Sequence, residues 1–144
     1  LFIYANVCRL IKMKISTRGR YALRVLIDLA EQNSNGYIAM KEVAKRQQIS
    51  LKYLERILPV LVSAKLIEGI QGKGGGYRLT RKPEEYPIAE ILALTEGDIA
   101  PVACLSCDAQ PCNRRENCKT LPMWKELNNL ISNYLNTKTI ADLI

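Results

Sequence analysis

The chain of 144 residues has no histidine, a single tryptophan and a single phenylalanine. The lack of histidine excludes imidazole as a metal ligand or a catalytic base in this sequence. No stretch reaches the roughly 18 apolar residues of a membrane-spanning helix. The first residues, 1–12, also lack the basic start, continuous apolar core and cleavage site of a signal peptide. We therefore expect a cytoplasmic protein without a membrane partner.

Length and composition indicate one medium domain, or a small domain with an added arm. Hydrophobic residues make up 48% of the chain, which is enough to bury a core without disulfides. Residues 1–12 are apolar only in patches, and Met13 would be a natural starting residue. We therefore interpret residues 1–12 as an N-terminal extension outside the fold.

Charge is divided unevenly along the chain. Residues 13–82 carry fourteen Lys and Arg against five Asp and Glu, whereas residues 83–144 carry five against nine. A basic half beside an acidic half predicts a polyanionic partner such as nucleic acid. The alternative is a basic surface that only keeps the protein in solution.

The spacing of apolar residues predicts a mostly helical chain with one small hairpin. Ser16 or Thr17 caps the first helix, an Asn-Ser-Asn-Gly turn at 33–36 ends it, and Ser50 caps the third helix. Pro59 lies inside the third helix and is expected to kink or strain it. The predicted helices cover residues 17–30, 40–47, 51–65, 87–97 and 121–136. The predicted strands cover 66–70 and 77–80, and a last turn covers 140–144.

Helix, short helix, helix and glycine-rich hairpin is the element order of a winged helix-turn-helix. The four glycines between the two strands permit a tight turn, which would form the wing. We expect this DNA-binding domain to span residues 13–82. A linking helix and a cysteine-rich sensor loop would follow at 83–120, and a dimerisation helix with a C-terminal turn at 121–144.

The third predicted helix offers side chains for reading DNA. The first turns of a recognition helix enter the major groove, so the candidate DNA-binding residues there are Ser50, Lys52, Tyr53, Glu55 and Arg56. Glu55 fits beside DNA where it accepts a hydrogen bond from a cytosine amine. The alternative is an ordinary amphipathic helix with a solvated charged face.

Two further segments offer contacts to the DNA backbone. Lys73, Tyr77 and Arg78 of the wing would meet the sugar-phosphate backbone or the minor groove, and Arg18 and Arg20 would position phosphates. The glycine run lacks the Lys-Ser/Thr ending and the strand-to-helix setting of a P-loop. We therefore reject nucleotide binding there.

Four of the five cysteines lie within fifteen residues, with the spacing C-x2-C-x4-C-x5-C: Cys104, Cys107, Cys112 and Cys118. In a reducing compartment such a cluster favours a metal or redox site over a structural disulfide. Thiolates suit iron–sulfur clusters and zinc, and the close, unequal pairs fit neither common zinc-finger pattern. We rank a cluster above zinc. A redox enzyme built on Cys104 and Cys107 would leave the basic half unexplained, so we expect no enzymatic activity.

The last predicted helix has an apolar stripe too long for a chain of this size to cover. The stripe consists of Leu121, Trp124, Leu127, Ile131, Tyr134 and Leu135. Antiparallel pairing with a second copy would bury it in a two-fold interface, as expected of a protein that binds paired half-sites. We predict a homodimer, with packing onto its own domain as the alternative.

Three segments resemble the Rrf2 family of bacterial winged-helix repressors: MKISTRGRYA at 13–22, ISLKYLE at 49–55 and GKGGGY at 72–77. The resemblance extends from Met13 to the C-terminus. The family includes iron–sulfur regulators, nitric-oxide sensors and cysteine-metabolism repressors. It implies a repressor that binds a double-stranded DNA operator, and a cluster that shifts the angle between the two DNA-binding domains of a dimer.

The resemblance also implies a ligand set. Cluster-binding members hold a [2Fe–2S] or [4Fe–4S] cluster on three loop cysteines, which correspond here to Cys107, Cys112 and Cys118. Cys104 is an extra thiol and a candidate fourth ligand. The histidine and the acidic residue that serve as fourth ligands in other members correspond to Leu121 and Arg20.

A second branch of the family implies a different control. Cysteine-metabolism members can lack the cluster, and the chain shares their Gly-Asp-Ile-Ala-Pro segment at 97–101. The alternative is then a cluster-free repressor controlled by a cysteine-biosynthesis enzyme or a small thiol ligand, with the cysteines oxidised or bound to zinc. A cluster would be lost from an aerobic preparation, so its absence there is also expected.

Overall fold

The computed structural model describes residues 14–32 and 36–144. The expected extension at 1–12, the start at Met13 and most of the turn at 33–36 lie outside the described residues. In the described part, the helices are α2 (Thr17–Glu31), α3 (Met40–Gln47), α4 (Leu51–Ser63), α5 (Ile88–Glu96) and α6 (Leu121–Thr137). The strands are β1 (Ile67–Ile70) and β2 (Gly76–Leu79), and the short 3-10 helices are η1 (Pro83–Glu85), η2 (Ala103–Leu105), η3 (Arg115–Asn117) and η4 (Ile140–Leu143). The predicted mostly helical winged helix-turn-helix with a long C-terminal helix is confirmed.

Local sequence signals explain the helix boundaries. The Ser16 hydroxyl oxygen accepts a hydrogen bond from the Gly19 N–H at the start of α2, and the Ser50 hydroxyl oxygen accepts one from the Tyr53 N–H at the start of α4. Between α3 and α4, Gln48 adopts a left-handed conformation with φ of 52°, which makes the turn of the helix-turn-helix tight. Helix α4 continues through Pro59 without ending.

The wing is a two-stranded antiparallel hairpin in which Ile67 faces Leu79 and Ile70 faces Gly76. Its turn uses Gly72 and Gly74 at φ of 95° and 78°, a backbone region that favours glycine. On its other edge, β2 forms an isolated bridge to Ile38. The wing is thereby attached to the segment that leads into α3.

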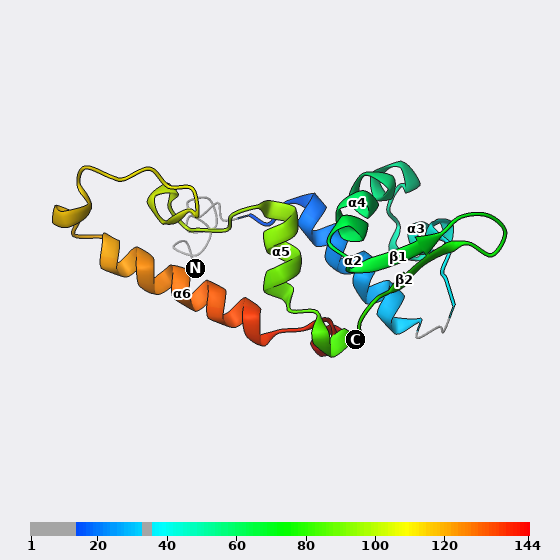
Figure 1. Ribbon diagram of the computed structural model, residues 1–144. Helices are drawn as coiled ribbons and strands as arrows, with labels where there is room; N and C mark the ends of the chain where they lie inside the picture. Colours follow the sequence, from blue (N-terminus) through cyan, green and yellow to red (C-terminus); the bar gives the residue numbers. More distant parts are fainter. Residues whose placement is uncertain (1–13, 33–35) are drawn as a thin grey trace, which may run out of the picture.

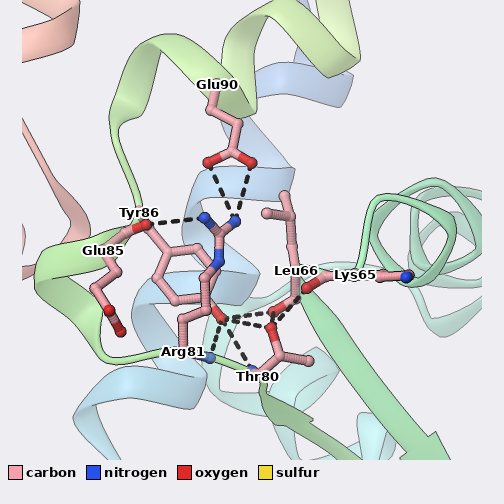
Figure 2. Close-up of polar contacts among 7 residues, drawn as sticks. All are labelled: Lys65, Leu66, Thr80, Arg81, Glu85, Tyr86 and Glu90. Carbon is pink, nitrogen blue, oxygen red and sulfur yellow. Dashed lines mark hydrogen bonds and ion pairs between the residues drawn. The ribbon is translucent and has the colours of Figure 1, made fainter.

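Tyr86 ties the wing to the helices around it (Figure 2). Its side chain is completely buried, and its hydroxyl accepts hydrogen bonds from the Thr80 and Arg81 N–H groups at 2.9 and 3.0 Å and donates one to the Leu66 carbonyl at 2.7 Å. The Arg81 guanidinium lies over the Tyr86 ring and pairs with Glu90 of α5 at 2.9 Å. The base of the wing, the residues that follow α4 and the helix α5 therefore meet at the Tyr86 side chain.

Helix α6 lies at the end of the molecule opposite the wing, and α5 stands between them (Figure 1). The chain then returns to the half that carries the wing: Ile88 N–H donates to the Lys138 carbonyl at 2.8 Å, and Ile140 N–H donates to the Tyr86 carbonyl at 3.1 Å. Ile140 is fully buried in the core. The far end of α6 is thus anchored beside the base of the wing. No helix in residues 14–32 and 36–144 is long and apolar enough to cross a membrane.

Replacing Tyr86 by Phe should lower the free energy of unfolding by about 2 kcal/mol, because it removes the three hydrogen bonds that the buried hydroxyl makes with backbone groups of Leu66, Thr80 and Arg81. Urea denaturation monitored by circular dichroism measures the change. Tyr37→Phe is the matched control, since Tyr37 is only half-buried and the new ring keeps the contact with Arg78. Equal losses in the two variants would contradict the role given to the Tyr86 hydroxyl.

Candidate nucleic-acid interface and cysteine loop

The first turns of α4 present a polar, charged face. Ser50, Lys52, Glu55 and Arg56 are exposed there, as expected for a recognition helix. Lys52 and Arg56 are four residues apart and lie on one side of the helix. Neither has an ion-pair partner among the described residues, so both are available to phosphates or base edges.

Tyr53 has a different position from its neighbours on α4. It is half-buried, and its ring meets the ring of Tyr21 edge-on, with centroids 5.2 Å apart. The Arg24 guanidinium lies over the Tyr21 ring, 5.3 Å from its centroid. This contact fixes the first turn of α4 against the N-terminal half of α2. It brings Arg18 and Arg20, both exposed, to the same region as the recognition helix.

The predicted wing residues are divided between solvent and the protein itself. Lys73 is exposed at the turn, whereas Tyr77 and Arg78 are half-buried. The Arg78 guanidinium pairs with Glu68 on the neighbouring strand at 2.6 Å and lies over the Tyr37 ring. The hydrogen bond to Glu68 raises the pKa of Arg78. The pair uses the Nε–H of Arg78, so the predicted DNA contact would use the other N–H groups of its guanidinium.

A polar network that the sequence did not predict holds the helix-turn-helix together. Asp28 of α2 is 1% exposed and pairs with Arg46 of α3 at 2.6 Å, and it also accepts a hydrogen bond from the Gln47 side chain at 2.9 Å. Arg24 donates to the side chain and backbone of Gln47. The hydrogen bond to Asp28 raises the pKa of Arg46. The available signal was an aspartate on the apolar face of a predicted helix.

The four loop cysteines do not lie in one group. The residues lining a cavity of about 20 Å³ in the loop are Cys104, Cys112, Arg115, Cys118 and Leu121. Cys107 is exposed outside this cavity, and its backbone N–H donates to Asp98 at 2.8 Å. Three of the four cysteines, Cys104, Cys112 and Cys118, therefore line one small cavity, and Cys107 lies outside it.

The chemistry of the cavity fits a soft ligand. Its three thiols make an all-sulfur donor set, and the hydrogen bond with Thr120 is the largest cause of the lowered pKa of Cys118, with the charge of Arg114 adding to it. A lowered pKa favours the thiolate, which is the form that binds metal. Within residues 14–32 and 36–144, however, no three His, Cys, Asp or Glu side chains already converge as a metal site.

Helix α6 packs on its own chain along one side and leaves another side open. The predicted stripe residues Leu121, Trp124, Leu127, Ile131 and Leu135 are half-buried, whereas Tyr134 is 62% exposed. Two further apolar residues are open to solvent, Met123 at 51% and Leu130 at 61%. The sequence analysis missed both, although their spacing with Tyr134 places all three on one side of the helix.

The model of the family described as "Rrf2: Iron-dependent Transcriptional regulator" matches residues 15–144. The chain belongs to the Rrf2 family. Protein rrf2 of Nitratidesulfovibrio vulgaris is 39% identical, over 92% of this chain and 87% of its own length. The regulator IscR of Aliivibrio salmonicida is 30% identical, over 92% and 77%.

Two solved structures of regulators are similar to this chain over most of its length. CymR of B. subtilis, described as its global cysteine regulator, superposes with a TM-score of 0.72 and 32% identity, over 90% of this chain and 95% of that one. IscR of T. potens gives a TM-score of 0.71 and 28% identity, over 92% and 86%. Rrf2 proteins are transcriptional regulators and not enzymes, which rules out the redox-enzyme alternative.

Replacing Arg56 by Ala should weaken DNA binding by about 1 to 3 kcal/mol and leave stability unchanged, because the side chain is exposed. Replacing Arg46 by Ala should instead lower the free energy of unfolding by about 2 kcal/mol, because Gln47 is then the one side-chain donor to Asp28 among the described residues, while part of the site reaches solvent. Fluorescence anisotropy with a duplex enriched from a random pool by the wild-type protein, and urea denaturation, separate the two effects. Unchanged DNA affinity in Arg56→Ala would contradict the recognition-helix assignment.

Proposed function

We propose that this Rrf2 regulator is a homodimeric repressor whose affinity for a double-stranded DNA operator depends on the state of its cysteine loop. The observation that carries the proposal is the combination of an exposed basic recognition helix with three thiols around one cavity in the same chain. The proposed division places the DNA-binding domain at 13–82, the sensor loop within 83–120 and the dimerisation helix at 121–144.

The DNA-binding half supports operator recognition by charge and by shape. Lys52 and Arg56 project from α4, Lys73 from the wing, and Arg18 from the start of α2. Contacts of this kind to phosphates position the protein, and contacts from α4 to base edges would give sequence preference. Glu55 would disfavour bases that offer no donor in the groove.

Two half-sites on an operator require two copies of the chain. The exposed Met123, Leu130 and Tyr134 of α6 give a second copy an apolar surface to cover. Leu130 and Tyr134 also line a groove of about 650 Å³ between α6 and the segment around the end of α5, together with Glu96, Ile99 and Pro101 among others. We assign this groove and the open side of α6 to the second copy.

Replacing Leu130 by Asp should shift the protein from dimer to monomer at micromolar concentration, because it introduces a charge into the proposed interface. Folding should be unaffected, since Leu130 is 61% exposed. Sedimentation equilibrium measures the change. Asn129→Asp is the matched control, because it adds the same charge to the adjacent exposed position. A monomeric wild type, or a dimeric Leu130→Asp variant, would contradict the assignment.

Cys104, Cys112 and Cys118 would hold an iron–sulfur cluster in this regulator, with zinc as the alternative ion. A thiolate-bound cluster supplies a redox-active centre. The protein's own contribution is to place three thiols around one cavity and to favour the thiolate of Cys118. Leu121 lines the same cavity, so the position where other members have a histidine offers no ligand here.

The second candidate function is a cluster-free repressor controlled through its thiols, by oxidation, by a small ligand or by a cysteine-biosynthesis enzyme. The likeness to CymR, described as the global cysteine regulator of B. subtilis, favours it. Anaerobic protein with visible absorption and matching iron and sulfide supports the cluster. Colourless protein whose DNA affinity still changes on thiol oxidation supports the second candidate.

Exchanging Cys104 for Ser should weaken iron binding by at least about tenfold, as loss of a ligand costs no less than loss of a supporting partner. Cys112→Ser should behave alike, whereas Cys107→Ser should load as wild type because Cys107 lies outside the cavity. Iron and sulfide analysis after anaerobic reconstitution gives the comparison. Loading by Cys104→Ser and not by Cys107→Ser would restore the ligand set that the resemblance implied.

A further inference from the structure

Helix α5 ends on a side chain, Glu96, that binds the N-cap residue of helix α2. The Glu96 carboxylate accepts hydrogen bonds from the Ser16 N–H at 3.1 Å and from the Ser16 hydroxyl at 2.6 Å. The Ser16 hydroxyl oxygen in turn accepts the Gly19 N–H at 3.2 Å. Glu96, which is 80 positions from Ser16 in the chain, therefore holds the N-cap of helix α2, whose first turn carries Arg18 and Arg20.

The packing at this junction is close. Gly19 is buried in α2, and a Cβ atom at that position would collide with the Glu96 carboxylate and lie 3.1 Å from the Thr95 hydroxyl. A side chain at position 19 would therefore push the Glu96 carboxylate away from Ser16. Thr95 itself is buried and donates to the Ile91 carbonyl of the same helix at 3.0 Å.

The residues that follow Glu96 hold the cysteine loop. Gly97 ends α5 at φ of 78°. Asp98 then accepts hydrogen bonds from the Ala100 N–H at 2.7 Å and from the Cys107 N–H at 2.8 Å. Both lower the pKa of Asp98, with the Ala100 bond the larger cause. Three consecutive residues thus connect the cap of α2, a glycine turn and the middle of the sensor loop.

The charge of Glu96 is unexpected at this place. The Glu96 carboxylate binds Ser16, which lies two residues before Arg18, and a negative charge there repels the phosphates that Arg18 would bind. It is favoured at a helix N-terminus, and both of its oxygens are used on Ser16. Its presence beside a DNA-facing turn is explained if the geometry it imposes on that turn outweighs the repulsion.

We propose that Glu96 is a positioning residue that couples the cysteine loop to the DNA-facing start of helix α2. The coupling rests on the proposed function, since it assumes that the loop has two states. A change in the loop acts on Asp98, moves the end of α5 about Gly97, and alters the orientation of Arg18 and Arg20 through the Glu96–Ser16 contact. No base or phosphate contact is made by Glu96.

A double-mutant cycle between Glu96 and Arg18 tests the positioning role. The variants are Glu96→Ala, Arg18→Ala and the pair, and the readout is the Kd for the enriched duplex at fixed salt. Glu96→Ala should weaken binding about tenfold although it removes a negative charge. Arg18→Ala should cost about tenfold in the wild type and less than about threefold in the Glu96→Ala background.

Additive losses in this cycle would overturn the positioning role, because a variant that is merely less stable weakens binding independently of Arg18. Glu31→Ala is the matched control. It makes the same charge change at the exposed opposite end of α2, and it should not weaken binding. A tenfold loss in the control would also overturn the proposal.

Blocking the loop thiols tests the coupling. In a Cys8→Ser background, the ratio of Kd values before and after reaction with methyl methanethiosulfonate is measured for wild type and Glu96→Ala. A ratio that differs from one in the wild type and returns to one in Glu96→Ala supports the coupling. Equal ratios in the two proteins overturn it. A wild-type ratio of one contradicts control by the loop itself, while the cycle with Arg18 still decides the positioning role.

Discussion

The structure depends most on the buried hydroxyl of Tyr86. A tyrosine ring in a core contributes apolar area, but its hydroxyl must find partners there. This hydroxyl bonds backbone groups at the exit of α4 and at the end of the wing, and the Tyr86 carbonyl accepts the N–H of Ile140 near the chain's end. Helix α4, the wing and the C-terminal turn are therefore held at one point, and α5, which follows directly, starts from a fixed position.

In the basic half of the chain, some cationic side chains form ion pairs within the fold and others are exposed to solvent. Arg46 is held by the buried Asp28, Arg81 by Glu90 and Arg78 by Glu68. Lys52, Arg56 and Lys73 remain exposed on elements whose positions those pairs secure. A flexible surface of the same net charge would attract DNA equally, but it would not present α4 and the wing in one orientation.

Much of the fold and part of the site were predictable because they depend on local signals. Ser50 and Ser16 cap helices where the sequence placed them, and the glycine run forms the wing turn. The burial of Tyr53 against Tyr21, the pairing of Arg78 with Glu68 and the exclusion of Cys107 from the thiol cavity were not predictable. Each depends on which residues distant in the chain, or across a turn, come into contact, and spacing alone carries no such information.

The element order, the basic and acidic halves, the group of four cysteines and the family could be predicted from the chain alone, because periodicity, charge and motif spacing are properties of the chain. Which cysteines line one cavity, which side of α6 stays open and which side chain binds the N-cap of α2 became known with the folded arrangement. A hydrogen bond, a cavity or a covered face exists only when two segments meet. Their meeting is set by the packing of the whole core around Tyr86 and α5.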